Sequence, residues 1–360
     1  MRDSLKQTVA PLWQTYSSPG QPLRETTARA MRVIYGLWFV AFALKLMGSG
    51  WDIAWHFRFL RDDMAPPHII NTIGTMLVVG LVMFHTWTGY GVDRLSLRLM
   101  QAGIGTFLLA IPLDLLNHRI FGLDITAWSP THAMLYLGTA VMLLGVLRGW
   151  TLLVPESRLQ IGLAVGFWAF LLEDMLFPLG QQKYGVRAIA ALNAGRPTAD
   201  AELLMEAGAN PDLLAVPVPD WVYPIWHIAA AVLVLLAVRM VLGKRWAATS
   251  VTLAYLAYRV VSYGALVSIG FPDSYIPFIL LGTALAIDIT ESFQWRPIVG
   301  TLGLIGGVYG IAVLTDGLGI LMPPFPLGTA PLAALVTWSI WAGARWVYAS
   351  PVIERWRKLA

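Results

Sequence analysis

Long runs of apolar residues alternate with short polar segments along the whole of this chain. A run of about 18 or more apolar residues is long enough for one helix to cross the hydrocarbon core of a bilayer. We therefore predict an all-α, polytopic membrane helix bundle, with a core made by helices packing on helices. The pattern predicts ten membrane-spanning helices, at roughly residues 33–55, 67–91, 97–117, 130–148, 159–179, 221–242, 246–269, 275–290, 297–315 and 327–348.

The composition supports this fold class and excludes several kinds of site. Of the 360 residues, 57% are hydrophobic and 13% are charged, whereas a soluble domain carries about 25% charged residues. There is no cysteine, which excludes disulfide bonds, zinc or iron–sulfur sites built on thiolates, and attachment of c-type haem. Any metal ion must therefore be held by His, Asp, Glu, Asn, Met or backbone oxygen atoms.

The distribution of basic residues indicates the orientation. With the N-terminus in the cytoplasm, 17 of the 25 Lys and Arg residues lie in segments that face the cytoplasm, and 6 lie in segments outside. This asymmetry favours an even number of spans with both termini cytoplasmic. The net charge of +4 is small, and the basic residues sit in short loops and termini, so we expect no nucleic-acid partner.

The borders of the apolar runs divide the chain into five segments. The longest polar segment contains "NAGRPTADAELLMEAGANPD", which is typical of a short helix that ends at Gly208. This outer loop is either a lid or docking surface, or an ordered loop that covers the bundle. The segments are a cytoplasmic N-terminal segment (1–30), membrane helices one to five (31–180), the outer loop (181–219), membrane helices six to ten (220–350) and a cytoplasmic tail (351–360).

Two stretches at the borders of apolar runs carry the same polar pattern. The first is "WDIAWHFRFLRDDMAPPH" (51–68) and the second is "LDLLNHRIFGLDITAWSPTH" (113–132). Asp, His and Asp recur 62 residues apart, and in both stretches a proline shortly precedes a final histidine. This is an internal repeat. The two patterns are Asp52-x3-His56-x5-Asp62-x5-His68 and Asp114-x3-His118-x5-Asp124-x7-His132.

The spacing within each pattern favours a metal site over a hydrogen-bond network, which is the alternative. Asp and His four residues apart share one face of a helix, and the final histidine follows a proline that suits the first turn of the next helix. A short connection makes the two helices antiparallel neighbours, so one carboxylate and two imidazoles converge in each copy. Ionisable groups within a membrane are costly and are functional candidates. The predicted metal ligands are Asp52, His56, His68, Asp114, His118 and His132.

Other polar residues are candidates to complete these sites. Asp62 and Asp124 are placed to accept the distal imidazole hydrogen of a ligating histidine, which would fix its tautomer. His227 is a fifth histidine near the outer face, either a ligand or a hydrogen-bonded core residue. Glu173 and Asp174 are adjacent on a helix, so at most one is expected to face the interior, as a ligand, a proton relay or a residue that orients a ligand.

Three ionisable residues lie deeper in the predicted spans. His85 is read as a structural residue. Arg259 lies within the seventh predicted span, and a buried arginine needs a carboxylate partner. Asp288 is the candidate partner.

The ligand types leave the metal open. Imidazole and carboxylate suit Cu(II), Zn(II), Fe(II) or Ni(II), and two histidines with one carboxylate also match the facial triad of non-haem iron. The residues alone therefore do not choose among copper, zinc and non-haem iron.

The first stretch resembles the signature of the C subunit of copper-dependent membrane monooxygenases, the particulate methane and ammonia monooxygenases. There, Asp-x3-His precedes an Arg-Asp pair and then a Pro-x-His that opens the next helix. A second set in that subunit, Asn-x3-His-x13-His, has the spacing of Asp114, His118 and His132. The counterparts in the first stretch are Asp52, His56, Arg61, Asp62, Pro66 and His68, with a shared tryptophan at Trp55.

The resemblance covers about residues 40–150 and has two departures. The first set is one residue shorter between its histidines, and the second set has Asp where the family has Asn. The resemblance implies copper near the outer face, and oxidation of a small apolar molecule or ammonia with dioxygen. It also implies other membrane subunits as partners. We expect a multi-pass protein of a prokaryotic plasma membrane, surrounded by lipid, with its metal sites toward the outer face.

Three other functions compete with this one. An intramembrane zinc hydrolase also uses His and Asp from helix ends, but it needs one site and the motif is duplicated. A copper-handling or transport protein needs a continuous polar path, and only His85, Arg259 and Asp288 lie deep in the spans. A bis-histidine haem protein has no role for a carboxylate four residues before the histidine.

Overall fold

The computed structural model describes residues 16–56, 64–121, 127–179, 218–271, 274–320 and 322–351. Within these residues there is no β-strand, and the all-α prediction is confirmed. Each of the ten predicted spans coincides with one α-helix of 13 to 29 residues. The helices are α2 (Ala28–His56), α3 (Pro66–Thr88), α4 (Arg94–Phe121), α5 (Pro130–Leu153), α6 (Arg158–Met175), α10 (Val222–Leu242), α11 (Ala247–Ser268), α12 (Leu280–Ser292), α13 (Pro297–Gly317) and α14 (Ala330–Tyr348).

Eight of these helices are long and apolar enough to cross a membrane, which identifies a multi-pass membrane protein. The remaining two are α6 and α12. Helix α6 is 18 residues long and carries Arg158, Glu173 and Asp174. Helix α12 has only 13 residues, a length of about 20 Å, which is less than the hydrocarbon thickness of about 30 Å.

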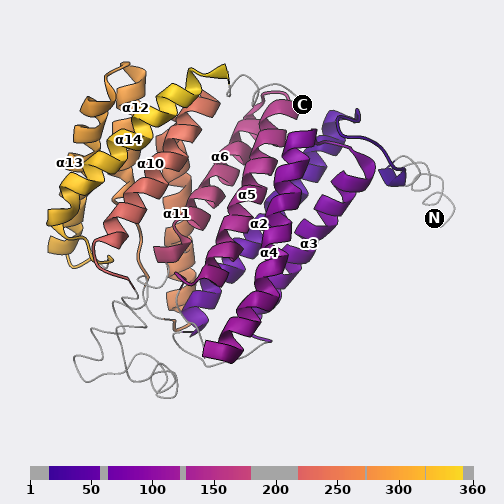
Figure 1. Ribbon diagram of the computed structural model, residues 1–360, viewed down its shortest axis with the longest axis horizontal. Helices are drawn as coiled ribbons and strands as arrows, with labels where there is room; N and C mark the ends of the chain where they lie inside the picture. Colours follow the sequence, from indigo (N-terminus) through magenta and orange to yellow (C-terminus); the bar gives the residue numbers. More distant parts are fainter. Residues whose placement is uncertain are drawn as a thin grey trace.

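The helices form two groups that follow the order of the chain (Figure 1). Helices α2 to α6 make up one group and α10 to α14 the other. Helix α6 lies between them, because it packs on α2 and α5 in its own group and on α10 and α11 in the second. The most extensive pairings among the described helices are α4 with α5 and α2 with α3, so the first group contains two consecutive helical hairpins.

The direction of the helices gives the bundle two distinct ends. Helix α2 starts and α14 ends on the upper side of Figure 1, and α2 and α4 both end on the lower side. The end of α2, the start of α3, the end of α4 and the start of α5 therefore all lie on the lower side. Both copies of the repeated motif begin and end at these helix ends.

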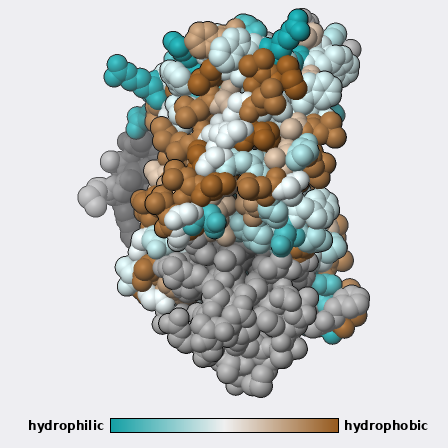
Figure 2. Space-filling model, turned by 90° about the vertical axis from the view of Figure 1, so that its left-hand side faces the viewer, coloured by the Kyte–Doolittle hydropathy of each residue, from teal (hydrophilic) through white to brown (hydrophobic). Residues whose placement is uncertain are grey.

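The lipid-facing surface is apolar, as a membrane span requires. The face formed by the left-hand side of Figure 1 carries a band dominated by apolar residues, with hydrophilic residues at its upper edge and again below the band (Figure 2). Exposed apolar side chains on α13 and α14 include Leu302, Val313, Leu314, Leu335 and Trp338. Exposed apolar residues on these helices are what a membrane-spanning surface requires.

The prediction that Asp288 is the partner of Arg259 is wrong. Arg259 pairs with Glu173 at 3.2 Å. Asp288 instead accepts hydrogen bonds from the backbone N–H groups of Ala248 and Thr249, at 3.3 and 2.8 Å, at the start of α11. The reason is depth, since ten residues of helix, about 15 Å, separate Thr249 from Arg259.

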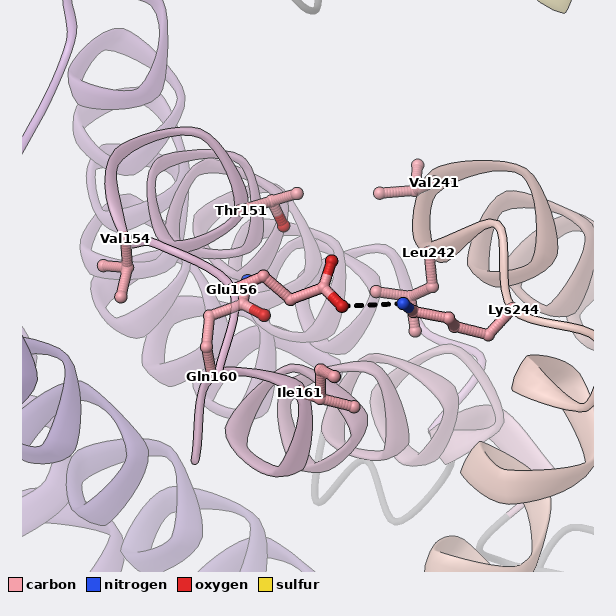
Figure 3. Close-up of a pocket in the computed structure, with 8 residues that line it drawn as sticks. All are labelled: Thr151, Val154, Glu156, Gln160, Ile161, Val241, Leu242 and Lys244. Carbon is pink, nitrogen blue, oxygen red and sulfur yellow. Dashed lines mark hydrogen bonds and ion pairs between the residues drawn. The ribbon is translucent and has the colours of Figure 1, made fainter. Parts of the chain in front are cut away.

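A small pocket on the upper side lies between the two groups of helices (Figure 3). Its central contact is an ion pair between Lys244 Nζ and Glu156 Oε1 at 2.7 Å. Both side chains are more than half exposed, so the pair contributes at most about 1 kcal/mol. The pocket lies at the opposite end from the repeated motif, and it is not a candidate for the metal chemistry. Its lining is Thr151, Val154, Glu156, Gln160, Ile161, Val241, Leu242 and Lys244.

Candidate metal centre

Each hairpin brings its aspartate against its final histidine. In the first hairpin, Asp52 Oδ1 lies 2.8 Å from His68 Nε2. In the second, Asp114 Oδ1 lies 3.5 Å from His132 Nε2. We name these the first pair (Asp52–His68) and the second pair (Asp114–His132). The two pairs come from equivalent positions of the repeat and contain four of the six predicted ligands, two of the three expected in each copy.

The local sequence explains why His68 and His132 lie at well-defined helix starts, opposite the aspartates of the preceding helices. Pro66 and Pro130 occupy the first turns of α3 and α5, where a missing N–H costs nothing and the fixed φ favours the helix. In the second hairpin, Ser129 also caps α5, because its hydroxyl accepts a hydrogen bond from the His132 backbone N–H at 3.3 Å. The imidazole therefore starts from a rigid helix end.

The two pairs differ in their surroundings. Thr131 donates a hydrogen bond from its hydroxyl to Asp114 Oδ1 at 2.6 Å. The side chains of the second pair are 18% and 23% exposed, and those of the first pair are 28% and 31% exposed. The second carboxylate is therefore more enclosed than the first.

The donor atoms fit a transition-metal ion. Each pair offers one carboxylate oxygen and one imidazole nitrogen from adjacent helices, and both ligand types bind copper, zinc and iron. The same contact also fits a hydrogen bond from the imidazole N–H to the carboxylate. A bound ion would require the facing nitrogen to lose its hydrogen.

The remaining members of the motif are placed only in part. His56 lies in the last turn of α2 and His118 near the end of α4, but their side chains lie outside the described part of the structure. Asp62 and Asp124 also lie outside the described residues, as does almost all of the predicted outer loop. Among the side chains that are described, no third acid or imidazole joins either pair.

Both predicted carboxylates of α6 are buried, so the expectation that at most one faces the interior is wrong. Glu173 accepts a hydrogen bond from the Tyr255 hydroxyl at 2.5 Å and pairs with Arg259. Asp174 is 3% exposed, and its Oδ2 atom has no hydrogen-bond partner in the described structure. The two side chains point to different sides of α6. Both are covered by protein, because α6 lies between the two groups of helices.

His227 lies in the second turn of α10, inside the bundle. It is 1% exposed, and neither ring nitrogen has a hydrogen-bond partner in the described structure. The neighbouring Trp226 donates its indole N–H to the backbone oxygen of Met175 at 2.9 Å. His227 and Asp174 therefore lie at a similar depth, near the lower ends of α10 and α6.

His85 takes the structural role expected of it. Trp38 donates its indole N–H to His85 Nε2 at 3.0 Å, and His85 Nδ1 lies 2.7 Å from the backbone oxygen of Tyr90. The first contact makes Nε2 an acceptor, so Nδ1 carries the hydrogen. Both nitrogens are satisfied, which leaves none for a ligand.

The repeat extends from the motif into the packing of the hairpins. A Cβ placed on Gly74 would lie 2.8 Å from both the Ala41 oxygen and the Lys45 nitrogen. A Cβ placed on Gly138 would lie 2.8 Å from the Gly103 oxygen and 2.9 Å from the Phe107 nitrogen. These two sets of contacts occupy equivalent positions of the repeat, as the first pair and the second pair do. A Gly-Thr dipeptide that begins six residues after His68 and six residues after His132 is the sequence signal that would have revealed this.

Lys45 is a residue of the site region that the motif does not include. It is 2% exposed, and its ammonium donates to Thr75 Oγ1 at 3.1 Å. The same ammonium lies 3.5 Å from the centroid of the Phe107 ring, a cation–π contact. Lys45 is seven residues before Asp52, which places it about 10 Å beneath the first pair. A lone lysine within a long apolar run is the signal that marks it.

No family, no curated protein and no solved structure matches this chain.

Proposed function

We propose that this protein is a membrane metal-binding protein with copper as its ion, and that it is a subunit of a membrane complex that oxidises a small apolar molecule or ammonia with dioxygen. The ligands are the first and second pairs, each completed by the histidine four residues after its aspartate, His56 and His118. Both sites face the outer side of a prokaryotic plasma membrane.

The observation that carries the proposal is the recurrence of one Asp–His contact in two hairpins. A single contact of this kind at a helix end is a common hydrogen bond. Two such contacts at equivalent repeat positions, on one side of the bundle, favour a shared role over two unrelated hydrogen bonds. The resemblance to the monooxygenase C subunits supports copper over zinc and iron as the expected ion.

The residues of such a site would have different roles. The carboxylates of Asp52 and Asp114 balance the charge of a cation, and the imidazoles of His68 and His132 supply nitrogen ligands from fixed helix starts. The Thr131 hydroxyl holds the Asp114 carboxylate in place, as partners of metal ligands commonly do. When bound, copper supplies redox chemistry with dioxygen.

Metal analysis of the intact chain tests this proposal. The protein is purified from membranes in detergent, and bound metals are quantified by mass spectrometry together with an optical and an electron paramagnetic resonance spectrum. We expect copper in a stoichiometry of two per chain and a Cu(II) resonance. As a matched control, Asp316→Asn removes an exposed carboxylate at the lower end of α13, and it should leave the copper content unchanged.

The other outcomes separate the alternatives. Zinc without a paramagnetic signal favours the zinc hydrolase, and a Soret band favours a haem protein. Copper that is bound and then released to a chelator, without consumption of dioxygen in the presence of a reductant, favours a copper-handling protein. Absence of any metal above the level of the control preparation contradicts the proposal.

A further inference from the structure

The pocket on the upper side of the bundle lies at the depth where membrane spans end. The candidate spans of α5 and α10 end at Leu153 and Leu242, and the lining residues all fall within 151–161 and 241–244. Lipid head groups begin where the hydrocarbon core ends. The pocket has a volume of about 110 Å³, which is room for several groups of the size of a water molecule. It is therefore a cavity of useful size at the level of the head groups.

One wall of the pocket carries a positive and a negative group. Lys244 follows α10 and Glu156 precedes α6, and their side chains meet between the two groups of helices at 2.7 Å (Figure 3). The two side chains are 55% and 66% exposed, so solvent screens their attraction. A ligand that offers an opposite charge to each of them can therefore replace the pair at little cost.

Gln160 adds a buried polar group to the same pocket. It is 6% exposed and lies in the first turn of α6. Its backbone N–H donates to the Ser157 hydroxyl at 3.1 Å, and its backbone oxygen accepts from the Trp150 indole N–H at 2.9 Å. Its side-chain amide lines the pocket and has no hydrogen-bond partner among the described residues. A buried amide without a partner is costly, which indicates that the pocket holds a polar ligand or water.

The rest of the lining is apolar. It consists of Val154, Ile161, Val241 and Leu242. Val241 is 41% exposed, so the apolar part of the pocket continues onto the surface of α10. A ligand with a charged head and an apolar body matches both parts of this lining.

We propose that this pocket binds the head group of an aminophospholipid, which carries a phosphate and a primary ammonium. The phosphate accepts hydrogen bonds from the Lys244 ammonium and the Gln160 amide, and the lipid ammonium donates to the Glu156 carboxylate. Both charges of the pocket are then paired, whereas an anionic lipid would leave Glu156 beside a phosphate. The bound lipid bridges the two groups of helices at the end opposite the Asp–His pairs, so the site does not depend on the proposed function.

Native mass spectrometry of the full chain in detergent, titrated with single lipids, tests this site. We expect one phosphatidylethanolamine per chain, bound about tenfold more tightly than phosphatidylglycerol or phosphatidylcholine. Phosphatidylglycerol has no ammonium, and the ammonium of phosphatidylcholine has no N–H to donate. Lys244→Gln and Glu156→Gln should each weaken the binding of phosphatidylethanolamine about tenfold, because each removes one charged partner.

Arg245→Gln is the matched control for surface charge. Arg245 is exposed beside Lys244, but it does not line the pocket, and its guanidinium lies 5.3 Å from the centroid of the Trp246 ring. This variant should bind phosphatidylethanolamine as the wild type does. All the substituted side chains are exposed, and an unchanged midpoint of thermal unfolding shows that the fold is intact.

Three results would overturn the proposal. The first is equal affinity of the wild type for all three lipids, and the second is equal weakening in Lys244→Gln and Arg245→Gln, which would indicate attraction by surface charge alone. The third is displacement of the lipid by an equal concentration of glycerophosphoethanolamine, which has the same head group without acyl chains. That result would assign the pocket to a soluble ligand.

Discussion

Glu173 and Asp174 are neighbours in α6, and their side chains point to different sides of the helix, yet both are buried. Adjacent helical positions are about 100° apart, so Glu173 reaches Tyr255 and Arg259 in α11. Asp174 lies on a different side of the helix and is 3% exposed, so it is also covered by protein. The sequence shows both carboxylates, but not that α6 has protein on both sides, because that depends on how the two groups of helices associate.

The ion pair between Glu173 and Arg259 should stabilise the bundle only while both partners are present. Removal of one partner of a buried pair costs about 3–5 kcal/mol, because an uncompensated charge stays behind. Arg259→Met alone should therefore lower the midpoint of thermal unfolding strongly, and Glu173→Gln with Arg259→Met should recover much of the loss. Unfolding in detergent, followed by circular dichroism, measures both.

The control for this cycle is the exposed pair of Glu156 and Lys244. Lys244→Met should change the unfolding midpoint little, since surface pairs contribute at most about 1 kcal/mol. Additive losses in the double variant of the buried pair would show that Glu173 and Arg259 are not energetically coupled.

At the scale of helices, apolar runs and prolines predict where the helices lie in the sequence, but they do not predict which side chains are partners. The ten runs predict ten helices in the described chain, and eight of these helices are long and apolar enough to cross a bilayer. Pro66 and Pro130 indicate the first turns of helices, and α3 and α5 begin at these two prolines, one residue before the predicted span in the case of α3. Partners such as Glu173 for Arg259 could not be predicted, because they depend on the relative depth of helices that are distant in sequence.

The two hairpins should be equally sensitive to the size of the residue at their crossing points. Gly74→Ala and Gly138→Ala each place a Cβ within 2.9 Å of backbone atoms of the partner helix, and overpacking of this kind costs about 1–3 kcal/mol. Gly80→Ala and Gly105→Ala lie on α3 and α4 with nothing within 4 Å, and they serve as matched controls. Chemical unfolding in mixed micelles measures the difference.

In these variants we expect Gly74→Ala and Gly138→Ala to unfold at lower denaturant than the wild type, while both controls unfold at or above it. Equal stability of all four variants would show that the hairpins do not depend on close contact at the glycines. Loss in one hairpin only would show that the repeat does not extend into the packing.

At the scale of the whole molecule, the two ends of the bundle should face different compartments. The chain has no cysteine, so single cysteines can be introduced without further change. Glu156 is exposed on the upper side and Asp316 on the lower side. From the distribution of basic residues, we expect a membrane-impermeant maleimide to label Asp316→Cys in intact cells, and to label Glu156→Cys only after permeabilisation. The reverse result would contradict the proposed orientation.

The measurement that tests the central claim most directly is the metal content of His68→Ala and His132→Ala, purified separately and beside the wild type. Two independent sites predict that each variant loses one equivalent of copper and keeps the other. Asp316→Asn, which changes a carboxylate at the same end of the bundle, keeps both. Wild-type metal content in both histidine variants would contradict the account, because the two Asp–His pairs would then be hydrogen bonds and not ligands.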